Sequence, residues 1–407
     1  MLKEVLSEIK PTKKEEADFK RVTTSFLKKL NAKLKDAKAI IGGSGAKGTW
    51  LKGAHDVDIF VVFNYKKFST KSSELSDILD PVMKKCFPKH KRVHGSRDYF
   101  QITYQNFDFE VVPILNISKA EQAKNITDIS PLHVKWVKKQ KRNDDMRLAK
   151  HFARAIGVYG AESYISGFSG YVLEILIGYY GSFEKFLKAA SSWESGLIID
   201  VENYYKKKKV MLELNQSKLQ SPITVIDPVD KSRNAAAALS AEKFTFLRTA
   251  ANEFVKNPRK EIFTKERISF KELKKLNTNI VYLEIQPLSG KRDVVGSKLL
   301  KAFEFMKKEL NEFGLLDSGW EFDGKALVYF SLQRKLLEPS FVREGPPTKL
   351  DHATQNFKRK NKDTFVKGKR IYANIQRKHV ELKKAVIALV KEKYVTERVK
   401  KIKITLL

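Results

Sequence analysis

The sequence has almost no cysteine and no long apolar segment. Its 407 residues include one cysteine, Cys86, which excludes an internal disulfide bond and a zinc site built from cysteines. No stretch reaches the roughly 18 consecutive apolar residues that a membrane-spanning helix requires. Residues 1–20 are charged and lack the apolar core of a secretory signal, so we expect a cytoplasmic protein without a membrane segment.

Acidic residues are also scarce relative to basic ones. The chain has 79 Lys and Arg against 47 Asp and Glu, which gives a formal net charge of +32. Since 42% of the residues are hydrophobic, we expect a globular chain, and its length suits roughly two to four domains. Such a charge implies a polyanionic partner; nucleic acid is the leading candidate and a membrane surface is the competing one.

Hydrophobic periodicity predicts an α+β multidomain protein. Residues 1–134 should form a mixed region with a capping box at Thr12 and Glu15, and with helices over 12–35 and 72–86. Its strands are predicted over 39–41, 56–63, 99–104 and 107–112, the last two joined by a Gln105-Asn106 turn. Residues 135–260 should be helical, including helices over 170–180 and 240–256.

The C-terminal region, residues 261–407, is predicted to return to mixed structure. It shows a strand over 278–286, a helix over 295–314 and a hairpin over 320–333. This order with exposed aromatics is common in small RNA-binding sheets, and an ordinary α+β packing module fits it equally well. From Lys349 onward, 18 Lys or Arg accompany 5 Asp or Glu, which we interpret as a basic helical tail.

Two carboxylates stand at the start of a predicted buried strand. Asp56 and Asp58 lie two residues apart and therefore point to the same face, and Glu110 would join them if its strand is a neighbour. Buried carboxylates are costly without a compensating charge. Three of them would hold two Mg²⁺ ions, one activating a hydroxyl nucleophile and one stabilising the leaving oxygen of a phosphoryl transfer. Solvated strand ends are the competing interpretation.

A glycine–serine turn precedes these acids. Glycines in Gly43-Ser44-Gly45 allow close backbone approach, and the backbone N–H groups and the Ser44 hydroxyl can hold phosphate oxygens. Lys47 lies within reach of the same charge. The pattern is not a P-loop, and a plain strand-to-helix turn is the competing interpretation.

These motifs together resemble a known family. GSGAKGTWL, DVD and EVVP are similar to the nucleotidyltransferase superfamily that includes DNA polymerase β, and more closely to the archaeal, class I CCA-adding tRNA nucleotidyltransferases. The resemblance continues in order through PLHVKW (131–136), 156–187, 225–240 and GPPTKL (345–350). It implies a polymerase β-like catalytic head (1–134), a helical central domain completing the nucleotide site (135–260), and a tRNA-binding, RRM-like α/β body with its tail (261–407).

The resemblance also implies roles for single residues. Catalytic ligands of Mg²⁺ would be Asp56, Asp58 and Glu110. The nucleotide would be bound by Ser44, Lys47, His133, Lys150, Tyr159 and Arg233. Glu110 stands where the family usually has Asp, and Lys47 where Arg is common, so a bidentate phosphate contact is lost there. The competing interpretations are a structural histidine for His133, a core aromatic for Tyr159 and an ion pair with Asp230 for Arg233.

Arg233 resembles the family's base-reading arginine. Cytosine N3 and adenine N1 both accept hydrogen bonds, whereas uracil and guanine present an N–H at that edge. An unpaired buried donor costs about 1–3 kcal/mol, so one arginine can favour CTP and ATP over the other two nucleotides.

Three functions remain in competition. The first is template-independent addition and repair of the 3′-terminal CCA of tRNA from CTP and ATP, with release of pyrophosphate; the resemblance suggests a homodimer. The second is a poly(A)-type or partial (CC- or A-adding) RNA nucleotidyltransferase. The third is a catalytically decayed tRNA-binding protein, against which the intact Asp56, Asp58 and Glu110 argue.

Overall fold

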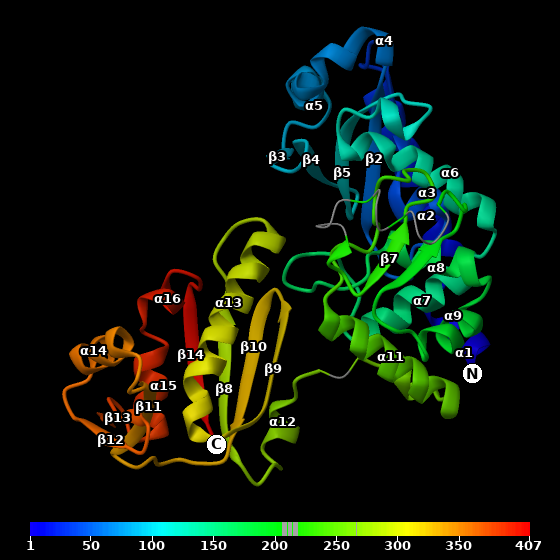
Figure 1. Cartoon of the computed structure of the whole chain (residues 1–407). Helices are drawn as coiled ribbons and strands as arrows, with labels where there is room; N and C mark the ends of the chain where they lie inside the picture. Colours follow the sequence, from blue (N-terminus) through cyan, green and yellow to red (C-terminus); the bar gives the residue numbers. More distant parts are fainter. Residues whose placement is uncertain (206–209, 211–213, 215–218, 266) are drawn as a thin grey trace. The chain divides into compact units, whose positions relative to one another are not determined.

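The computed structural model describes residues 1–205, 210, 214, 219–265 and 267–407. The chain divides into two units, Met1–Glu266 and Arg267–Leu407 (Figure 1). The expected head and central domain therefore pack within one unit. The boundary expected at residue 134 falls inside helix α6 (Ser130–Gln140).

A five-stranded mixed sheet forms the first part of this unit. Its order is β1-β2-β5-β4-β3; β2 and β5 run parallel and the other neighbours antiparallel. The strands are β1 (Ala37–Ile41), β2 (Asp56–Phe63), β3 (Lys91–Val93), β4 (Tyr99–Tyr104) and β5 (Phe107–Leu115). The predicted turn between β4 and β5 is confirmed: Gln105 and Asn106 both have positive φ, +49° and +66°, as a type I′ turn requires.

Four helices accompany this sheet. They are α2 (Lys13–Asn31), α3 (Gly43–Lys47), α4 (Tyr65–Phe68) and α5 (Leu75–Cys86). The capping box of Thr12 and Glu15 starts α2 as predicted. Phe26 of α2 stacks on Phe87 and on Phe109 of β5, with ring centroids 4.2 and 4.0 Å apart, which fixes the helix against the sheet. The predicted glycine–serine turn is in fact the first turn of α3.

The second part of the unit is mainly helical. Beside α6 it contains α1 (Leu2–Ile9), α7 (Asn143–Ala155), α8 (Gly170–Tyr180), α9 (Phe183–Ala190) and α11 (Ala241–Lys256). The prediction of α8 is confirmed, with Gly181 (φ +84°) ending it. The prediction of helices over 135–260 missed two short strands, β6 (Leu197–Asp200) and β7 (Ile223–Ile226), which pair in parallel. Apolar runs this short do not distinguish helix from strand by period.

The second unit contains an antiparallel sheet of order β14-β8-β10-β9. Its strands are β8 (Asn279–Gln286), β9 (Leu315–Asp323), β10 (Lys325–Leu332) and β14 (Lys401–Leu406). Helix α13 (Arg292–Leu310) packs on one face (Figure 1). On the other face, Tyr282 is only 8% exposed and contacts Phe270 beside Leu273, both from α12 (Phe270–Leu273). The expected exposed aromatic surface is therefore partly covered.

The expectation of a helical tail from Lys349 onward is wrong in part. The segment does contain α14 (Asp351–Lys360), α15 (Leu382–Leu389) and α16 (Lys393–Thr396). It also contributes β12 (Thr364–Lys367) and β13 (Arg370–Gln376), which form a sheet with β11 (Ser340–Pro347), and β14. Lysine and isoleucine alternate in KIKI, residues 401–404, which is the period of a half-buried strand. Among the described residues, no helix is long and apolar enough to cross a bilayer.

Candidate active site

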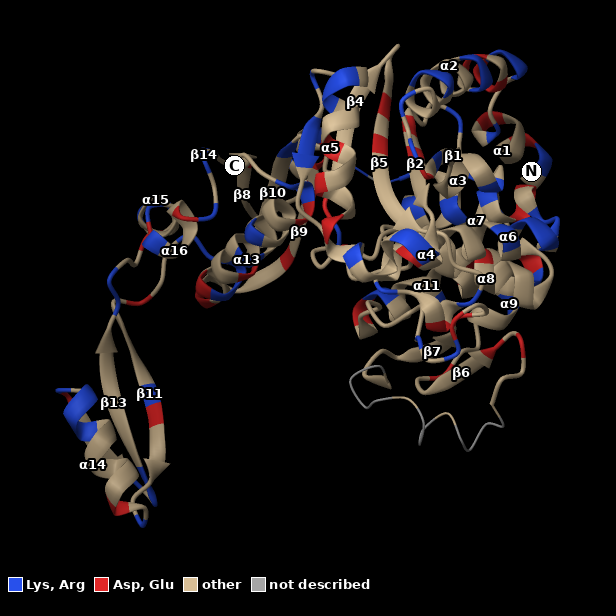
Figure 2. Ribbon diagram, turned by 90° about the horizontal axis from the view of Figure 1, so that it is seen from above, with Lys and Arg blue, Asp and Glu red and all other residues tan. Residues whose placement is uncertain are grey.

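The predicted acids meet at one end of β2 and β5. In the register of these parallel strands, Asp58 lies opposite Glu110 and Asp56 opposite Asp108. Red bands on the neighbouring strands β2 and β5 mark acids of this kind in Figure 2. The sheet thus brings the three predicted metal ligands to one edge, although they come from segments about 50 residues apart in the chain.

The electrostatics of this edge suit a cation. Burial, and then repulsion from Glu110 and Asp56, raise the pKa of Asp58 to about 6, while Lys47 opposes the shift. A divalent ion would remove this repulsion, so the donor set fits a metal. The side chains are not in ligand positions as they stand: within the described residues, no three His, Cys, Asp or Glu side chains are arranged to hold a metal ion. Glu110 instead accepts a hydrogen bond from Gln101 (2.9 Å).

Helix α3 packs directly against Asp58. Gly43 has φ +51°, and a Cβ at this position would lie 1.6 Å from Oδ2 of Asp58. The neighbouring backbone N–H of Gly42 donates to the Asp58 carbonyl (2.7 Å). Glycine is therefore required at position 43, both for the backbone conformation and for the space that the carboxylate occupies. The same helix carries Ser44 and Lys47, the predicted phosphate contacts.

A buried carboxylate from α8 joins two of the predicted nucleotide-binding lysines. Glu174 accepts hydrogen bonds from Lys47 Nζ (2.7 Å, to Oε2) and from Lys150 Nζ and Thr49 Oγ1 (both 2.6 Å, to Oε1). Burial alone would raise the pKa of Glu174, but attraction to Lys150 and Lys47 outweighs it and lowers the pKa to about 2. Glu174 is thus ionised, and its hydrogen bonds link the sheet region to the helical region.

A second buried carboxylate, Asp227, joins the other two predicted cationic positions. His133 Nε2 lies 3.2 Å from Asp227 Oδ2, Arg233 Nη1 donates to the same oxygen (3.0 Å), and Tyr171 donates to Oδ1 (3.0 Å). Burial lowers the pKa of His133, and Asp227 only partly offsets this effect. Arg233 pairs with Asp227, whereas the competing interpretation from the sequence was an ion pair with Asp230. The Tyr171 ring stacks on His133 and also lies under the Lys47 ammonium, 5.0 Å from the ring centroid, so it connects both clusters.

Tyr159 lies beside the Glu174 cluster. A Cβ built on Gly170, at the start of α8, would be 2.9 Å from the Tyr159 hydroxyl and 3.4 Å from Cε of Lys150, so both side chains close around this glycine. The guanidinium of Arg154 stacks over the Tyr159 ring at 4.7 Å. The structure therefore gathers Tyr159 with Lys150, as the predicted site requires.

Sequence reasoning did not single out Glu174, Tyr171 or Asp227. For Glu174 a signal existed, since it is the one charged residue in GYVLEILIGYY and a lone charge on an apolar helix needs a buried partner. For Tyr171 and Asp227 we find no comparable signal in the sequence, because their roles depend on contacts with distant segments.

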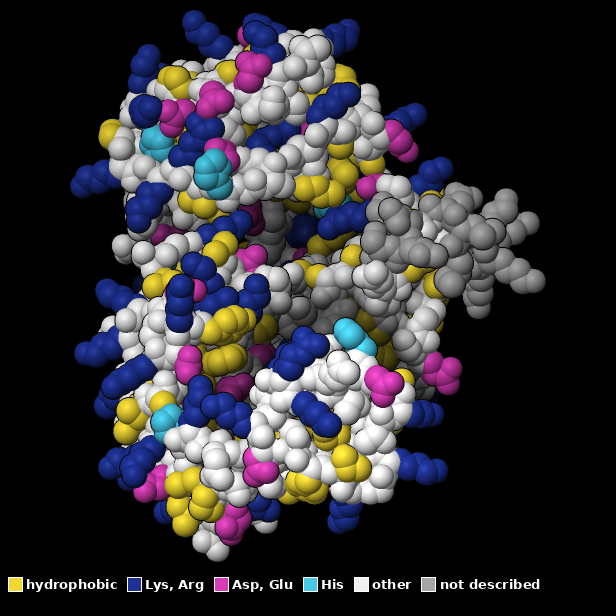
Figure 3. All heavy atoms as spheres, turned by 60° about the vertical axis from the view of Figure 1, so that its left-hand side comes forward, with side chains coloured by type: hydrophobic (Ala, Val, Ile, Leu, Met, Phe, Trp, Pro, Cys, Tyr) yellow, Lys and Arg dark blue, Asp and Glu magenta, His cyan; other side chains and the backbone are white. Residues whose placement is uncertain are grey.

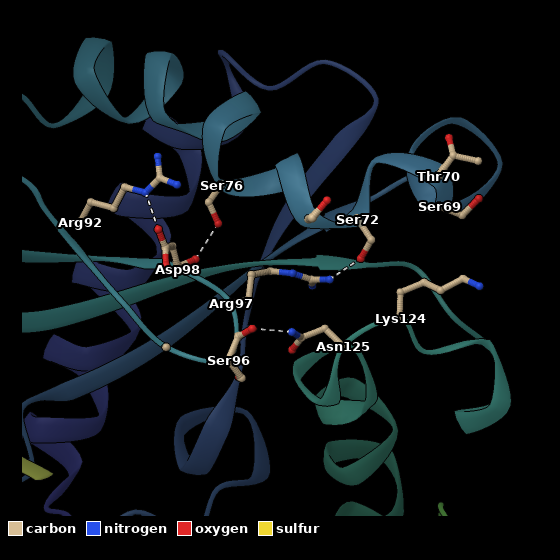
Figure 4. Close-up of a pocket in the computed structure, with 12 residues that line it drawn as sticks. Ser69, Thr70, Ser72, Ser76, Arg92, Ser96, Arg97, Asp98, Lys124 and Asn125 are labelled. Atoms are coloured by element: carbon tan, nitrogen blue, oxygen red, sulfur yellow. Dashed lines mark hydrogen bonds and ion pairs between the residues drawn. The ribbon is translucent and has the colours of Figure 1, made fainter. Parts of the chain in front are cut away.

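A separate polar cavity of about 460 Å³ lies in the same unit (Figure 4). Arg97 at its wall donates to the carbonyl of Pro113, toward the end of β5 that lies away from Asp108. Its arginines are balanced by acids, Arg97 by Asp128 and Arg92 by two aspartates. The cavity is lined by Ser69, Thr70, Ser72, Ser73, Ser76, Arg92, Gly95, Ser96, Arg97, Asp98, Lys124 and Asn125. We therefore assign it no part in the carboxylate site.

Two family profiles match adjoining parts of the chain. Residues 24–147 match the profile described as "Nucleotidyltransferase domain", and residues 144–264 match "tRNA nucleotidyltransferase, second domain". Together they cover the sheet with its acids and the helical region that supplies Glu174 and Asp227.

Curated relatives extend the similarity over most of the chain. A CCA-adding enzyme of Methanosarcina mazei is 34% identical over 375 residues, 88% of this chain and 80% of that protein. One of Pyrobaculum aerophilum is 34% identical over 404 residues, 94% of this chain and 92% of that protein. One of Nanoarchaeum equitans is 42% identical over 210 residues, and the match spans about half of either chain.

Solved structures agree on the fold. A structure of Cid1, titled for its RNA terminal uridylyl transferase activity, has a TM-score of 0.50 at 14% identity and covers 66% of this chain and 98% of that chain. At this identity the likeness concerns the fold alone, which is the polymerase β-like nucleotidyltransferase fold with mixed helices and strands.

Proposed function

Because this chain belongs to the family of archaeal CCA-adding enzymes, we propose that it adds and repairs the 3′-terminal CCA of tRNA, using CTP and ATP and releasing pyrophosphate. The observation that carries the proposal is the register of β2 and β5, which sets Asp58 opposite Glu110 at the edge where α3 packs. These strand ends would be the site of nucleotidyl transfer onto an RNA 3′-hydroxyl.

Each group of residues has a distinct task in this reaction. Asp56, Asp58 and Glu110 would hold Mg²⁺, whose charge, when bound, favours ionisation of the RNA hydroxyl and departure of pyrophosphate. Glu110, which accepts a hydrogen bond from Gln101 at Oε1, would turn toward the metal to join them. Catalysis of this kind depends on position and charge, and needs no further general base.

The cationic side chains would bind the nucleotide. Ser44, Lys47, Lys150, His133 and Tyr159 would contact the triphosphate, where the buried clusters already hold four of these five side chains close to Glu174 or Asp227. Lys47 stands where the family usually has arginine, and its ammonium lacks the planar fork that contacts a phosphate with two parallel hydrogen bonds. Its side chain is only 10% exposed, so a phosphate contact would still form in a weakly screened environment.

Arg233 would read the base. Its side chain is one-third exposed while Nη1 is held by Asp227, which leaves the rest of the guanidinium to face the acceptor edge of cytosine or adenine.

The second unit would bind tRNA. The strand order β14-β8-β10-β9, with α13 joining β8 to β9, supports an RRM-like body. Lys and Arg side chains are spread over the face drawn in Figure 3. From Lys349 onward, within the second unit, the sequence has 18 Lys or Arg against 5 Asp or Glu, which suits contacts with RNA phosphates. We further propose a homodimer in the cytoplasm, to be tested by light scattering and by localisation of a tagged chain.

Nucleotide incorporation tests the function directly. Purified protein with Mg²⁺, CTP and ATP should extend tRNA that ends at the discriminator base, at C or at CC, in each case to a complete CCA end. Asp58→Ala should abolish extension, whereas Asp77→Ala, an exposed acid on α5, should not. Activity on only some of these substrates would favour a partial CC- or A-adding enzyme, and long A-tracts a poly(A)-type enzyme. Tight tRNA binding without Mg²⁺-dependent extension would favour a decayed enzyme.

A further inference from the structure

Glu174 is an acid in an otherwise apolar helix, and its side chain is only 1% exposed. Burying a carboxylate is unfavourable by several kcal/mol unless cations and hydrogen-bond donors compensate for the lost water. All the side-chain hydrogen bonds of Glu174 described above go to Lys47, Thr49 and Lys150. The carboxylate therefore fixes the positions of the two lysines proposed to bind the triphosphate.

The two lysines are held differently. Lys150 Nζ donates to Thr49 Oγ1 (2.8 Å), to the Thr49 carbonyl (3.3 Å) and to Glu174 Oε1, so a phosphate contact at Lys150 would replace one of these three bonds. Lys47 donates one hydrogen bond in the described structure, to Glu174 Oε2, and its ammonium lies over the Tyr171 ring. Two N–H bonds of Lys47 are thus left for another acceptor without breaking the bond to Glu174.

The charges of this cluster do not balance. Lys47 and Lys150 carry two positive charges and Glu174 one negative charge, so the three side chains together carry one positive charge at 10%, 5% and 1% exposure. An incoming anion beside Lys47 would satisfy the remaining charge.

From these contacts we infer that Glu174 is a positioning residue for the nucleotide, acting through Lys47. Oε2 fixes the ammonium of Lys47 between α8 and α3, with two donors directed to the triphosphate. Oε1 keeps Lys150 and Thr49 in place behind it. The inference rests on the proposed role of Lys47 as a triphosphate contact. It assigns to Glu174 the task of orienting the Lys47 ammonium, which the net positive charge of the cluster would not accomplish by itself.

The variant Glu174→Gln distinguishes the roles of the two carboxylate oxygens, because an NH₂ group replaces one of them. A glutamine can still accept from Lys150 and Thr49 with its oxygen, but its NH₂ group cannot accept from Lys47. We expect Glu174→Gln to weaken binding of inorganic tripolyphosphate, measured by calorimetry without metal, by roughly tenfold, the range for one charge-assisted hydrogen bond. The KM for CTP and ATP should rise by a similar factor, with a much smaller change in kcat.

A double-mutant cycle tests whether Glu174 acts through Lys47. The double variant Glu174→Gln/Lys47→Met should bind tripolyphosphate no more weakly than Lys47→Met alone, because the same contact is lost in both. Asp128→Asn is the matched control: Asp128 is also a fully buried acid that holds a cation, Arg97, but it lies outside the site. It should lower the thermal midpoint without changing tripolyphosphate affinity.

A compensating pair keeps the test decisive if Glu174→Gln does not fold. Glu174→Asp retains the charge and withdraws it by one methylene, and Lys47→Arg supplies a longer, forked donor. The pair should bind tripolyphosphate more tightly than Glu174→Asp alone. Independent, multiplying losses in the cycle, or no rescue by Lys47→Arg, would overturn the inference. If wild-type protein binds tripolyphosphate as expected but adds no CCA to tRNA, the proposed function fails while this inference stands.

Discussion

Gly43 offers a sharp test of the site, because one added methyl group would displace Asp58, a proposed metal ligand. In Gly43→Ala the new Cβ would lie 1.6 Å from Oδ2 and 2.5 Å from Cγ of Asp58. Restoring van der Waals separation requires a displacement of roughly 2 Å, shared between α3 and the carboxylate. Since a misplacement of about 1 Å can cost about 100-fold in rate, we expect CCA addition to fall by about 100-fold or more.

The stability of this variant should change far less. An alanine at φ +51° costs about 1–2 kcal/mol, which corresponds to a loss of about 2–8 °C in thermal midpoint for a unit of this size. Gly157→Ala is the control, because Gly157 has φ +71° and open space around its Cβ position, so it carries the same backbone strain without a clash. The assay is single-turnover incorporation of labelled CMP into tRNA lacking CCA. If the two variants lose activity equally, the contact with Asp58 does not control catalysis and our reasoning fails.

Three further predictions follow from the structure. At pH values well above 6, Asp58→Asn should raise the thermal midpoint of the metal-free protein, whereas below pH 3.8 it should leave the midpoint unchanged. The reason is that a raised pKa makes the folded wild-type protein lose stability as this carboxyl ionises. Equal midpoints of the two proteins at high pH would contradict the raised pKa. Glu110→Asp should keep activity, since it restores the residue usual in the family, whereas Glu110→Gln should lose about 100-fold or more in kcat; an active Gln variant would exclude Glu110 as a metal ligand. Replacing the three basic residues in the last turn of α14, residues 358–360, by Gln should lower the salt dependence of tRNA binding by about one to three in log–log slope, measured by filter binding, and an unchanged slope would place the RNA elsewhere.

Much of the local structure could be predicted from the sequence. The apolar run after Asp58 gave β2 with the observed bounds, and the capping box placed the start of α2. The Gln105-Asn106 pair gave the turn between β4 and β5. These features depend on residues close together in the chain, where period and turn chemistry are sufficient.

The rest depends on contacts between distant segments. Glu174 meets Lys47 across 127 residues, and no periodic pattern reports such a partner. The close approach of Gly43 to Asp58, which leaves no space for a methyl group, also appears only in three dimensions. The strands of the basic C-terminal segment were missed for a related reason: β14 is a strand because β8 is there to pair with it, while the density of lysine suggested an exposed helix.

The pairing of β14 with β8 has a consequence for how the protein is made. Residues 401–406 complete the sheet beside residues 281–286, and Ile280 and Leu407 exchange backbone hydrogen bonds. The 115 residues from Gln286 to Lys401 take roughly 6–23 s to synthesise at about 5–20 residues per second. Throughout that interval β8 has an unpaired edge, which is a site for association with other chains. Biogenesis of the second unit should therefore be sensitive to ribosome pausing between these two strands and to the chaperones that bind nascent chains.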